Sequence, residues 1–148
     1  MTKQRLKRFN RLLIASAFLL IVLIGFVVLA QRPSRLVLAN AIFTYELAST
    51  PSKQLQGLSG RSSLPLDHAM LFVFQAAGQD CFWMKDMHFP LDIIWLNDQK
   101  QAVYIKENAT PQSYPEQFCP DKLARYVVEV NAGVAKGAGL KLGDTVRF

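Results

Sequence analysis

Residues 70 to 74 read MLFVF, from Met70 to Phe74, and this run decides the expected fold. It holds five consecutive apolar side chains and is bounded by turn-forming residues on both sides. A short apolar run of this kind is typical of a strand that is buried on both faces. We therefore expect these residues at the centre of a sheet, with the other elements arranged around them.

Upstream of this run, apolar residues alternate with more polar ones from Val37 to Leu47, which predicts one strand with a single buried face. Thr50 can cap a helix and Pro51 suits its first turn, so a short helix is expected over residues 51 to 57, ending at Gly57. Residues 58 to 67 contain glycine and proline and read as a loop.

Downstream, apolar and β-branched runs predict further strands, and residues 132 to 138 predict a second short helix. The polar residues 97 to 100 predict a hairpin connection, and residues 109 to 121, with three prolines, form the longest irregular stretch. These downstream strands are expected at residues 81–84, 91–96, 102–106, 124–130 and 145–148.

The expected fold is a β-rich α+β domain, a compact barrel or sandwich of about seven short strands with two short helices.

The segment from Leu12 to Ala30, LLIASAFLLIVLIGFVVLA, contains nineteen residues without a charge. As a helix it would be roughly 28 Å long, which is close to the thickness of the hydrocarbon core of a bilayer. Five basic residues precede it, so residues 1–11 are expected to stay in the cytoplasm and the C-terminal part to lie outside, in the periplasm or beyond. The predicted organisation is a basic tail (1–11), a transmembrane signal anchor in the inner membrane (12–30), a linker (31–36) and one domain (37–148).

A cleaved signal peptide is the alternative, since Val28-Leu29-Ala30 resembles a cleavage site. The length of the apolar run favours the anchor, because signal-peptide apolar regions span about 7 to 15 residues. Both alternatives place the domain on the same side of the membrane.

The positive charge of the chain is concentrated in its leader. Seven of the 17 Lys and Arg residues lie within residues 1 to 35, where no acidic residue occurs. The remaining residues carry ten basic side chains against all eleven acidic ones, so the domain itself is close to neutral. Nucleic-acid binding is therefore not expected, because the domain has no excess of basic side chains to neutralise phosphates.

Cys81 and Cys119 are the two cysteines of the chain. An even number of cysteines in a domain expected in an oxidising compartment favours a disulfide, although two separate thiols remain the alternative. Because no C-x-x-C spacing is present, a thioredoxin-like redox role has little support.

Several motifs resemble the domain-of-unknown-function 192 family: GLSGR (57–61), MLFVF (70–74), FWMK (82–85), PLDIIWL (90–96) and ARYVVEVNAG (124–133). The resemblance implies a small β-rich domain that often follows a signal or membrane segment, and it implies no established reaction. Asp86 and Met87 stand where the family more often has Asn-Thr. The family positions that the resemblance marks for testing are Arg61, Lys85, Pro90 to Asp92, Arg125 and Tyr126.

Lys85 and Asp92 flank a turn through Pro90. If their segments pair as antiparallel strands, the two opposite charges lie on one face and fix the register. The functional alternative is a charged pair at the mouth of a pocket lined by Trp83 and Met84.

Arg61 lies in a glycine-flanked loop, where its guanidinium could clamp a carboxylate or phosphate of a ligand. The alternative is a tether of the loop to the domain itself, with Glu129 or Asp92 as acceptor.

Met84, Met87 and His88 form a weak candidate site for Cu(I), which prefers soft ligands outside the cytoplasm. Methionines near tryptophan more often fill gaps in a core, so no metal site or cofactor is expected. The two histidines, His68 and His88, have no carboxylate at a zinc-like spacing.

The sequence contains no G-x-S-x-G elbow and no phosphate-binding G-x-x-x-x-G-K loop. The leading hypothesis is a membrane-anchored accessory module of the cell envelope that binds a small ligand or an envelope protein, with Arg61, Trp83, Lys85, Asp92 and loop 109–121 as its face. The alternatives are a hydrolase that acts on small envelope molecules, with catalytic residues that the sequence does not identify, and soft-metal binding.

Overall fold

The computed structural model describes Ile14 and residues 34–148, and Ser34 to Phe148 form one compact unit. Within this described part, no helix combines the length and the apolar character needed to cross a bilayer. The predicted span 12–30 lies, apart from Ile14, outside the described residues. The membrane anchor therefore stays a prediction.

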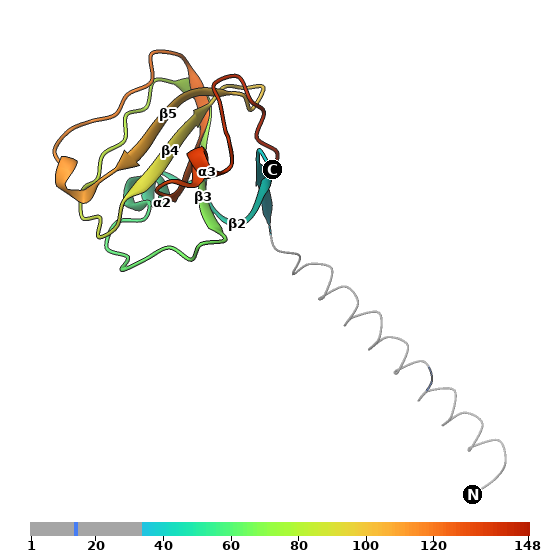
Figure 1. Ribbon diagram of the computed structural model, residues 1–148, viewed down its shortest axis with the longest axis horizontal. Coiled ribbons are helices and arrows are strands. Elements are labelled where there is room, and N and C mark those ends of the chain that lie inside the picture. The colour runs from blue at the N-terminus through green and yellow to red at the C-terminus, as the bar shows by residue number, and fades with distance from the viewer. Residues whose placement is uncertain (1–13, 15–33) are drawn as a thin grey trace, which may run out of the picture. The chain divides into compact units, whose positions relative to one another are not determined.

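Six strands form one mixed sheet in the order β1-β2-β3-β6-β4-β5 (Figure 1). Strands β2 and β3 are parallel, and every other neighbouring pair is antiparallel. Two short α-helices and one 3-10 turn complete the described domain. The bounds are β1 (Arg35–Leu38), β2 (Ala41–Ala48), α2 (Pro51–Gln56), β3 (His68–Gly78), β4 (Leu91–Leu96), β5 (Ala102–Ala109), η1 (Pro111–Ser113), β6 (Ala124–Asn131) and α3 (Val134–Gly137).

The β-rich α+β class and the two short helices are confirmed, whereas the barrel or sandwich architecture is wrong: the strands form a single open sheet. The expected last strand, residues 145–148, is also wrong. Thr145 makes an isolated bridge to Gln101, and Arg147 makes one to Val37. Because Thr145 and Arg147 pair with different partners, the segment does not extend a continuous ladder along either one.

The single strand expected from Val37 to Leu47 is in fact a tight hairpin of β1 and β2. The chain reverses at Ala39 and Asn40, so that Leu38 pairs with Ala41. Ala39 adopts a positive φ of 49°, a backbone conformation found in tight turns. The apolar alternation continues through the turn and hides it, and Asn40 was the only turn-forming residue there.

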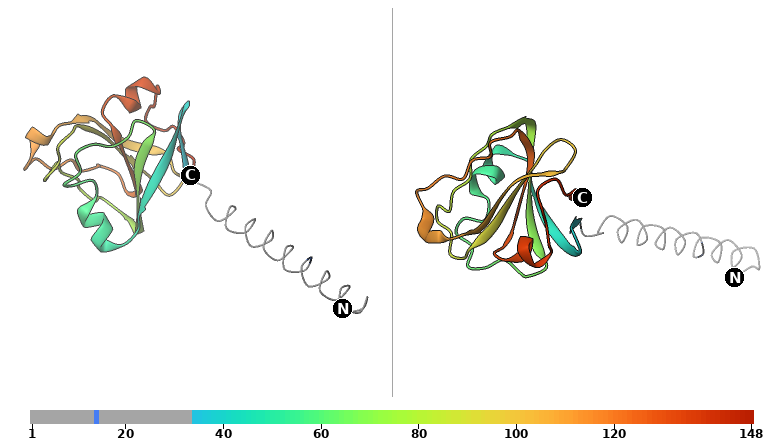
Figure 2. Two further views of the ribbon diagram at one scale, coloured as in Figure 1. Left: turned by 90° about the horizontal axis from the view of Figure 1, so that it is seen from below. Right: turned by 45° about the horizontal axis from the view of Figure 1, so that its top comes forward.

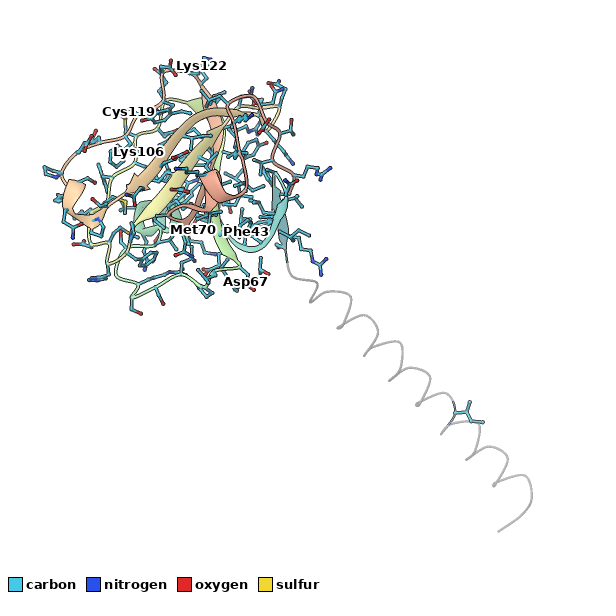
Figure 3. The ribbon with its side chains drawn as sticks, in the orientation of Figure 1. Phe43, Asp67, Met70, Lys106, Cys119 and Lys122 are labelled. Carbon is cyan, nitrogen blue, oxygen red and sulfur yellow. A yellow bond between two sulfur atoms is a disulfide. The ribbon has the colours of Figure 1, made fainter. Side chains whose placement is uncertain are left out.

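The strand expected over residues 81–84 is absent from the described sheet. Phe82 instead forms one bridge with Phe118, through backbone hydrogen bonds of 2.9 and 2.8 Å. Beside this bridge Cys81 and Cys119 form a disulfide, which confirms the predicted pairing. The cross-link and the bridge together fix the segment before Trp83 to the irregular loop 109–121. Figure 3 labels Cys119 in that loop.

The run MLFVF lies inside β3, which has β2 on one side and β6 on the other, as expected for an interior strand. Its side chains alternate between two hydrophobic clusters. Met70 and Phe72 belong to the cluster on the side of Leu58, which follows α2, and Leu71 belongs to the cluster that contains Ala135 of α3. Figure 2 shows α2 and α3 on different sides of the sheet. The sheet is thus covered on both faces.

Helix α2 forms as the sequence predicts. Thr50 caps it by accepting a hydrogen bond from the Lys53 backbone, and Pro51 occupies the first turn. The helix ends at Gly57, whose φ of 51° and ψ of −131° suit glycine. A β-carbon at this position would lie 3.4 Å from the Phe72 ring and 3.9 Å from Glu129 Oε2. The end of α2 therefore brings backbone close to one side chain of β6.

Candidate functional site

The side chain of Glu129 is the central feature of the candidate site. It lies on β6 between Met70 of β3 and Ile93 of β4, its register partners on the two flanking strands. Its exposed fraction is only 6%, and its Oε2 atom has no hydrogen-bond partner among the described residues. A buried polar atom without a partner costs free energy, so such an atom calls for an explanation.

Burial raises the pKa of Glu129 to about 8, because the charged carboxylate loses its hydration in the interior. The positive charge of Arg61 opposes this rise without cancelling it. At neutral pH the side chain is therefore mostly a neutral carboxylic acid. In that form it can donate as well as accept a hydrogen bond.

Glu129 lines a cavity of about 200 Å³ that opens to the surface. Its other buried lining residues are Leu58, Phe72 and Met87, and the segment from Gln54 to Ser59 provides one wall. This volume is below the roughly 300 to 1,000 Å³ of most ligand pockets. The cavity therefore suits a small molecule.

The segment from Asp80 to Trp83 provides a further part of the wall. Phe82 packs edge-to-face on Phe72, with ring centroids 4.9 Å apart, and on Trp95 at 5.5 Å. Trp83 is 42% exposed at the edge of the cavity. The disulfide of Cys81 holds this wall to the neighbouring loop, so the aromatic wall is fixed by covalent as well as packing interactions.

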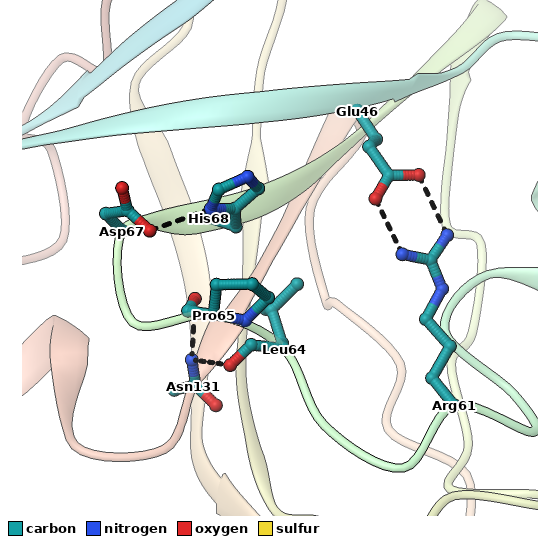
Figure 4. A network of polar contacts seen from close by, with 7 residues as sticks. All are labelled: Glu46, Arg61, Leu64, Pro65, Asp67, His68 and Asn131. Carbon is teal, nitrogen blue, oxygen red and sulfur yellow. Dashed lines mark hydrogen bonds and ion pairs between the residues drawn. The ribbon is translucent and has the colours of Figure 1, made fainter.

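Arg61 does not face the solvent as a free anion clamp. Its two terminal nitrogens donate to Glu46 on β2, at 2.6 and 2.8 Å (Figure 4). The tether alternative is thus the observed one, but its acceptor is Glu46 and not Glu129 or Asp92. Asn131 ties down the same loop further along, through its bonds to the carbonyls of Leu64 and Pro65.

The predicted pairing of Lys85 with Asp92 is wrong. Lys85 lies exposed in a turn, because residues 81–84 do not form a strand. Asp92 is fully buried and accepts hydrogen bonds from the backbone N–H groups of Asn108 and Ala135, at 2.9 and 2.8 Å. It joins the start of α3 to β5 and so belongs to the framework of the domain instead of an exposed face.

Arg125 and Tyr126 lie on β6 outside the cavity wall. Arg125 contacts Asp98 at 3.4 Å, and Tyr126 packs on Phe148 with a centroid distance of 5.2 Å. Of the residues in the proposed face and the marked family positions, only Trp83 lines the cavity. Loop 109–121 also contributes no cavity-lining residue, although Lys106 of β5 places its ammonium 4.3 Å from the Phe118 ring centroid.

The three weak metal candidates are not alike in their surroundings. Met84 and Met87 are buried in the hydrophobic cluster of Leu58 and Phe72, while His88 is exposed. Within the described residues, no group of three or more His, Cys, Asp and Glu side chains is arranged to hold a metal ion.

Sequence reasoning named Glu129 only as an acceptor for Arg61 and missed it as a site residue. The available signal was a single acidic residue in the apolar strand segment VVEV. Alternation along β6 places Val127 and Glu129 on one face and Val128 on the other. What the sequence could not show is that the end of α2 and the segment 80–83 leave a cavity beside that face.

The fold and the cavity define a small α+β domain, built on one mixed sheet, with a buried acidic side chain in the wall of a partly aromatic cavity. The chain belongs to the DUF192 family, described as an uncharacterized ACR, whose profile matches residues 36–148. This confirms the resemblance in the sequence motifs. No match was found among curated proteins.

Two solved structures are similar to the chain over most of its length. A protein of unknown function from Novosphingobium aromaticivorans is 30% identical, with a TM-score of 0.73, over 78% of this chain and 85% of that one. A Sinorhizobium meliloti protein, whose description proposes a role as a transcription regulator, is 35% identical, with a TM-score of 0.71, over 76% and 89% of the two chains.

Proposed function

We propose that this domain binds a small organic molecule in the cavity at Glu129, and that residues 12–30 hold it at the outer side of the inner membrane as an accessory module of the cell envelope. The observation that carries the binding proposal is that Glu129 lines the cavity while its buried Oε2 atom has no hydrogen-bond partner among the described residues. An apolar side chain at this position would avoid the desolvation cost. A ligand that bonds to the carboxyl group supplies the missing partner.

The composition of the cavity also supports binding. Phe72, Phe82 and Trp83 offer aromatic surface, and a few polar groups stand among them. Ligand sites commonly combine apolar walls with a small number of polar groups that orient the ligand. The packing of Phe82 on two other rings keeps its wall in place before a ligand arrives, which lowers the entropic cost of binding.

The location part of the proposal rests on the sequence of the leader and on the disulfide. Five basic residues before an uncharged run of nineteen favour a cytoplasmic N-terminus. The bond between Cys81 and Cys119 fits an oxidising compartment outside the cytoplasm.

The binding proposal is tested with the full-length chain in lipid nanodiscs, by ligand-observed NMR with a set of single-ring compounds. At least one is expected to bind, and Trp83→Ala should weaken its binding by about threefold to tenfold, because aromatic pairs contribute roughly 0.5 to 1.5 kcal/mol. Leu66→Ala removes an apolar side chain that is 82% exposed and outside the cavity wall, and it should leave binding unchanged. Equal binding by wild type and Trp83→Ala would place the compounds elsewhere and overturn the proposal.

A further inference from the structure

The charge of the cavity wall identifies a class of ligand. Of its fourteen lining residues, all in the described part of the chain, Asp80 and Glu129 are acidic and none is lysine, arginine or histidine. Arg61 lies close enough for its charge to act on Glu129, but both of its terminal nitrogens are already bonded to Glu46. The wall therefore offers carboxyl oxygens and no basic side chain.

A carboxylate or phosphate group is disfavoured in such a cavity. It would lose its hydration, meet no basic side chain, and lie near one or two acidic groups. The sequence had pointed to Arg61 as a binding group for an anion, whereas the cavity wall disfavours one.

An ammonium group has a complementary set of contacts. Its N–H groups can donate to the carboxyl group of Glu129, whose Oε2 has no partner among the described residues, and its charge is attracted to the faces of aromatic rings such as Phe82 and Trp83. The small volume limits the remainder of the molecule to about one ring or a short chain.

We infer that the cavity binds a small primary amine, with the ammonium on Glu129 and the apolar part against Phe72, Phe82 and Trp83. This inference rests on the proposed function and adds the chemical class of its ligand. Because the amine is a cation, Glu129 accepts its hydrogen bond as a carboxylate, and the proton that Glu129 holds in the empty protein is released to solvent on binding.

The test compares three probes with the same ring: benzylamine, benzyl alcohol and benzoate. Each is titrated by ligand-observed NMR at pH 8 against the full-length chain in phosphatidylcholine nanodiscs, with empty nanodiscs as the blank. Benzylamine should bind about fivefold to tenfold more tightly than benzyl alcohol, because a hydrogen bond to a charged group is worth roughly 1 to 1.5 kcal/mol more than a neutral one. Benzoate should bind most weakly of the three.

Glu129→Gln keeps the size of the side chain and removes its charge, so the preference for benzylamine should disappear. The matched control is Glu107→Gln, which removes one negative charge at an exposed position of β5 outside the cavity wall and should keep the preference. If Glu129→Gln does not fold, Asp80→Asn, at an exposed position of the wall, serves as the second variant and should reduce the preference severalfold.

The pH dependence provides an independent readout. The charged groups to consider are Glu129 itself, Asp80 on the wall and Arg61, whose charge reaches Glu129. Benzylamine affinity should rise between pH 6 and pH 8, since less work is needed to remove the Glu129 proton as the pH approaches its pKa. A ligand that used Glu129 as a neutral donor would show the opposite trend.

The possible outcomes separate the two proposals. Tighter binding of benzylamine that depends on Glu129 supports both. Benzyl alcohol or benzoate bound as tightly as benzylamine overturns the amine inference and leaves the cavity as a ligand site. Failure of all three single-ring probes to bind counts against the proposed function itself, and the inference falls with it.

Discussion

Both terminal nitrogens of Arg61 donate to the carboxylate of Glu46, at 2.6 and 2.8 Å, and so join the loop after α2 to strand β2. This two-point contact fixes the loop that begins at Gly57 on the cavity wall. It also uses the guanidinium N–H groups that would otherwise be able to bind the carboxylate or phosphate of a ligand. The loop arginine is thus part of the support of the site and not its binding group.

The Arg61–Glu46 pair should contribute modestly to stability. The two side chains are 37% and 49% exposed, and ion pairs of this exposure contribute roughly 0.2 to 1 kcal/mol. A double-mutant cycle with Arg61→Met and Glu46→Gln, followed by urea unfolding, measures the coupling. A coupling above about 2 kcal/mol would show that the pair is effectively desolvated.

The same pair predicts a pH dependence of its own. The hydrogen bond from Arg61 lowers the pKa of Glu46 below its usual value. The contribution is therefore complete above the ordinary glutamate pKa of the unfolded chain and is lost as the pH falls through the lowered pKa of the folded state. Repeating the cycle from pH 7 down to pH 3 should show the coupling decrease, and a constant coupling over this range would contradict the assignment.

Glu129→Gln should stabilise the empty protein at pH 8 and have little effect at pH 4. The raised pKa of about 8 means that the folded state retains a proton that the unfolded chain loses above the ordinary glutamate pKa. The contribution of Glu129 to stability is therefore greatest below that ordinary pKa and is lost as the pH rises to about 8. Denaturant unfolding of both proteins across this range should give a difference on the order of a few kcal/mol at pH 8. A difference independent of pH would mean that Glu129 titrates normally.

Reduction of the Cys81–Cys119 bond should destabilise the domain and loosen one cavity wall. The bond closes a long loop, with a sequence separation of 38, and such a cross-link is worth roughly 4 kcal/mol on the loop-entropy model. Unfolding of the full-length chain with and without reductant measures the loss. Cys81→Ser with Cys119→Ser should match the reduced wild type, and a much smaller effect would mean that the bridge constrains little.

Removing Asp92 should be among the most destabilising single changes. Asp92→Ala leaves the buried N–H group of Ala135 without an acceptor, at a cost of roughly 1 to 3 kcal/mol, and also removes the acceptor of the partly buried N–H group of Asn108. Hydrogen exchange at Ala135 should accelerate together with the loss of global stability. Asp144→Ala is the control, because its carboxylate accepts from Lys141 at an exposed turn and should cost far less.

A reporter fused after Phe148 tests the topology. Alkaline phosphatase at this position should be active, because it requires the oxidising side of the membrane to form its own disulfides. The same fusion without residues 12–30 should be inactive. Activity that did not depend on this segment would contradict its role in export.

Local signals in the sequence were sufficient for several elements. MLFVF predicted an interior strand, Thr50-Pro51 predicted helix α2, and the two cysteines predicted the disulfide. The first two patterns depend on residues close in the chain, and the third depends only on the even number of cysteines. The turn at Ala39 has little local signal because the apolar alternation runs through it, and residues 81–84 have the apolar character of a strand but only one bridge, at Phe82.

The sequence by itself determined the composition of each face of the sheet and the apolar segment before it, since alternation and length follow directly from residue order. Only the tertiary structure decided which groups the charged side chains contact and how deeply they are buried. It paired Arg61 with Glu46, made Asp92 accept from the backbone of α3, and left Oε2 of Glu129, a residue of the cavity wall, without a partner among the described residues. The reason is physical: burial and hydrogen bonding of a side chain depend on segments distant in the chain that fold against it, and no local pattern encodes their distance.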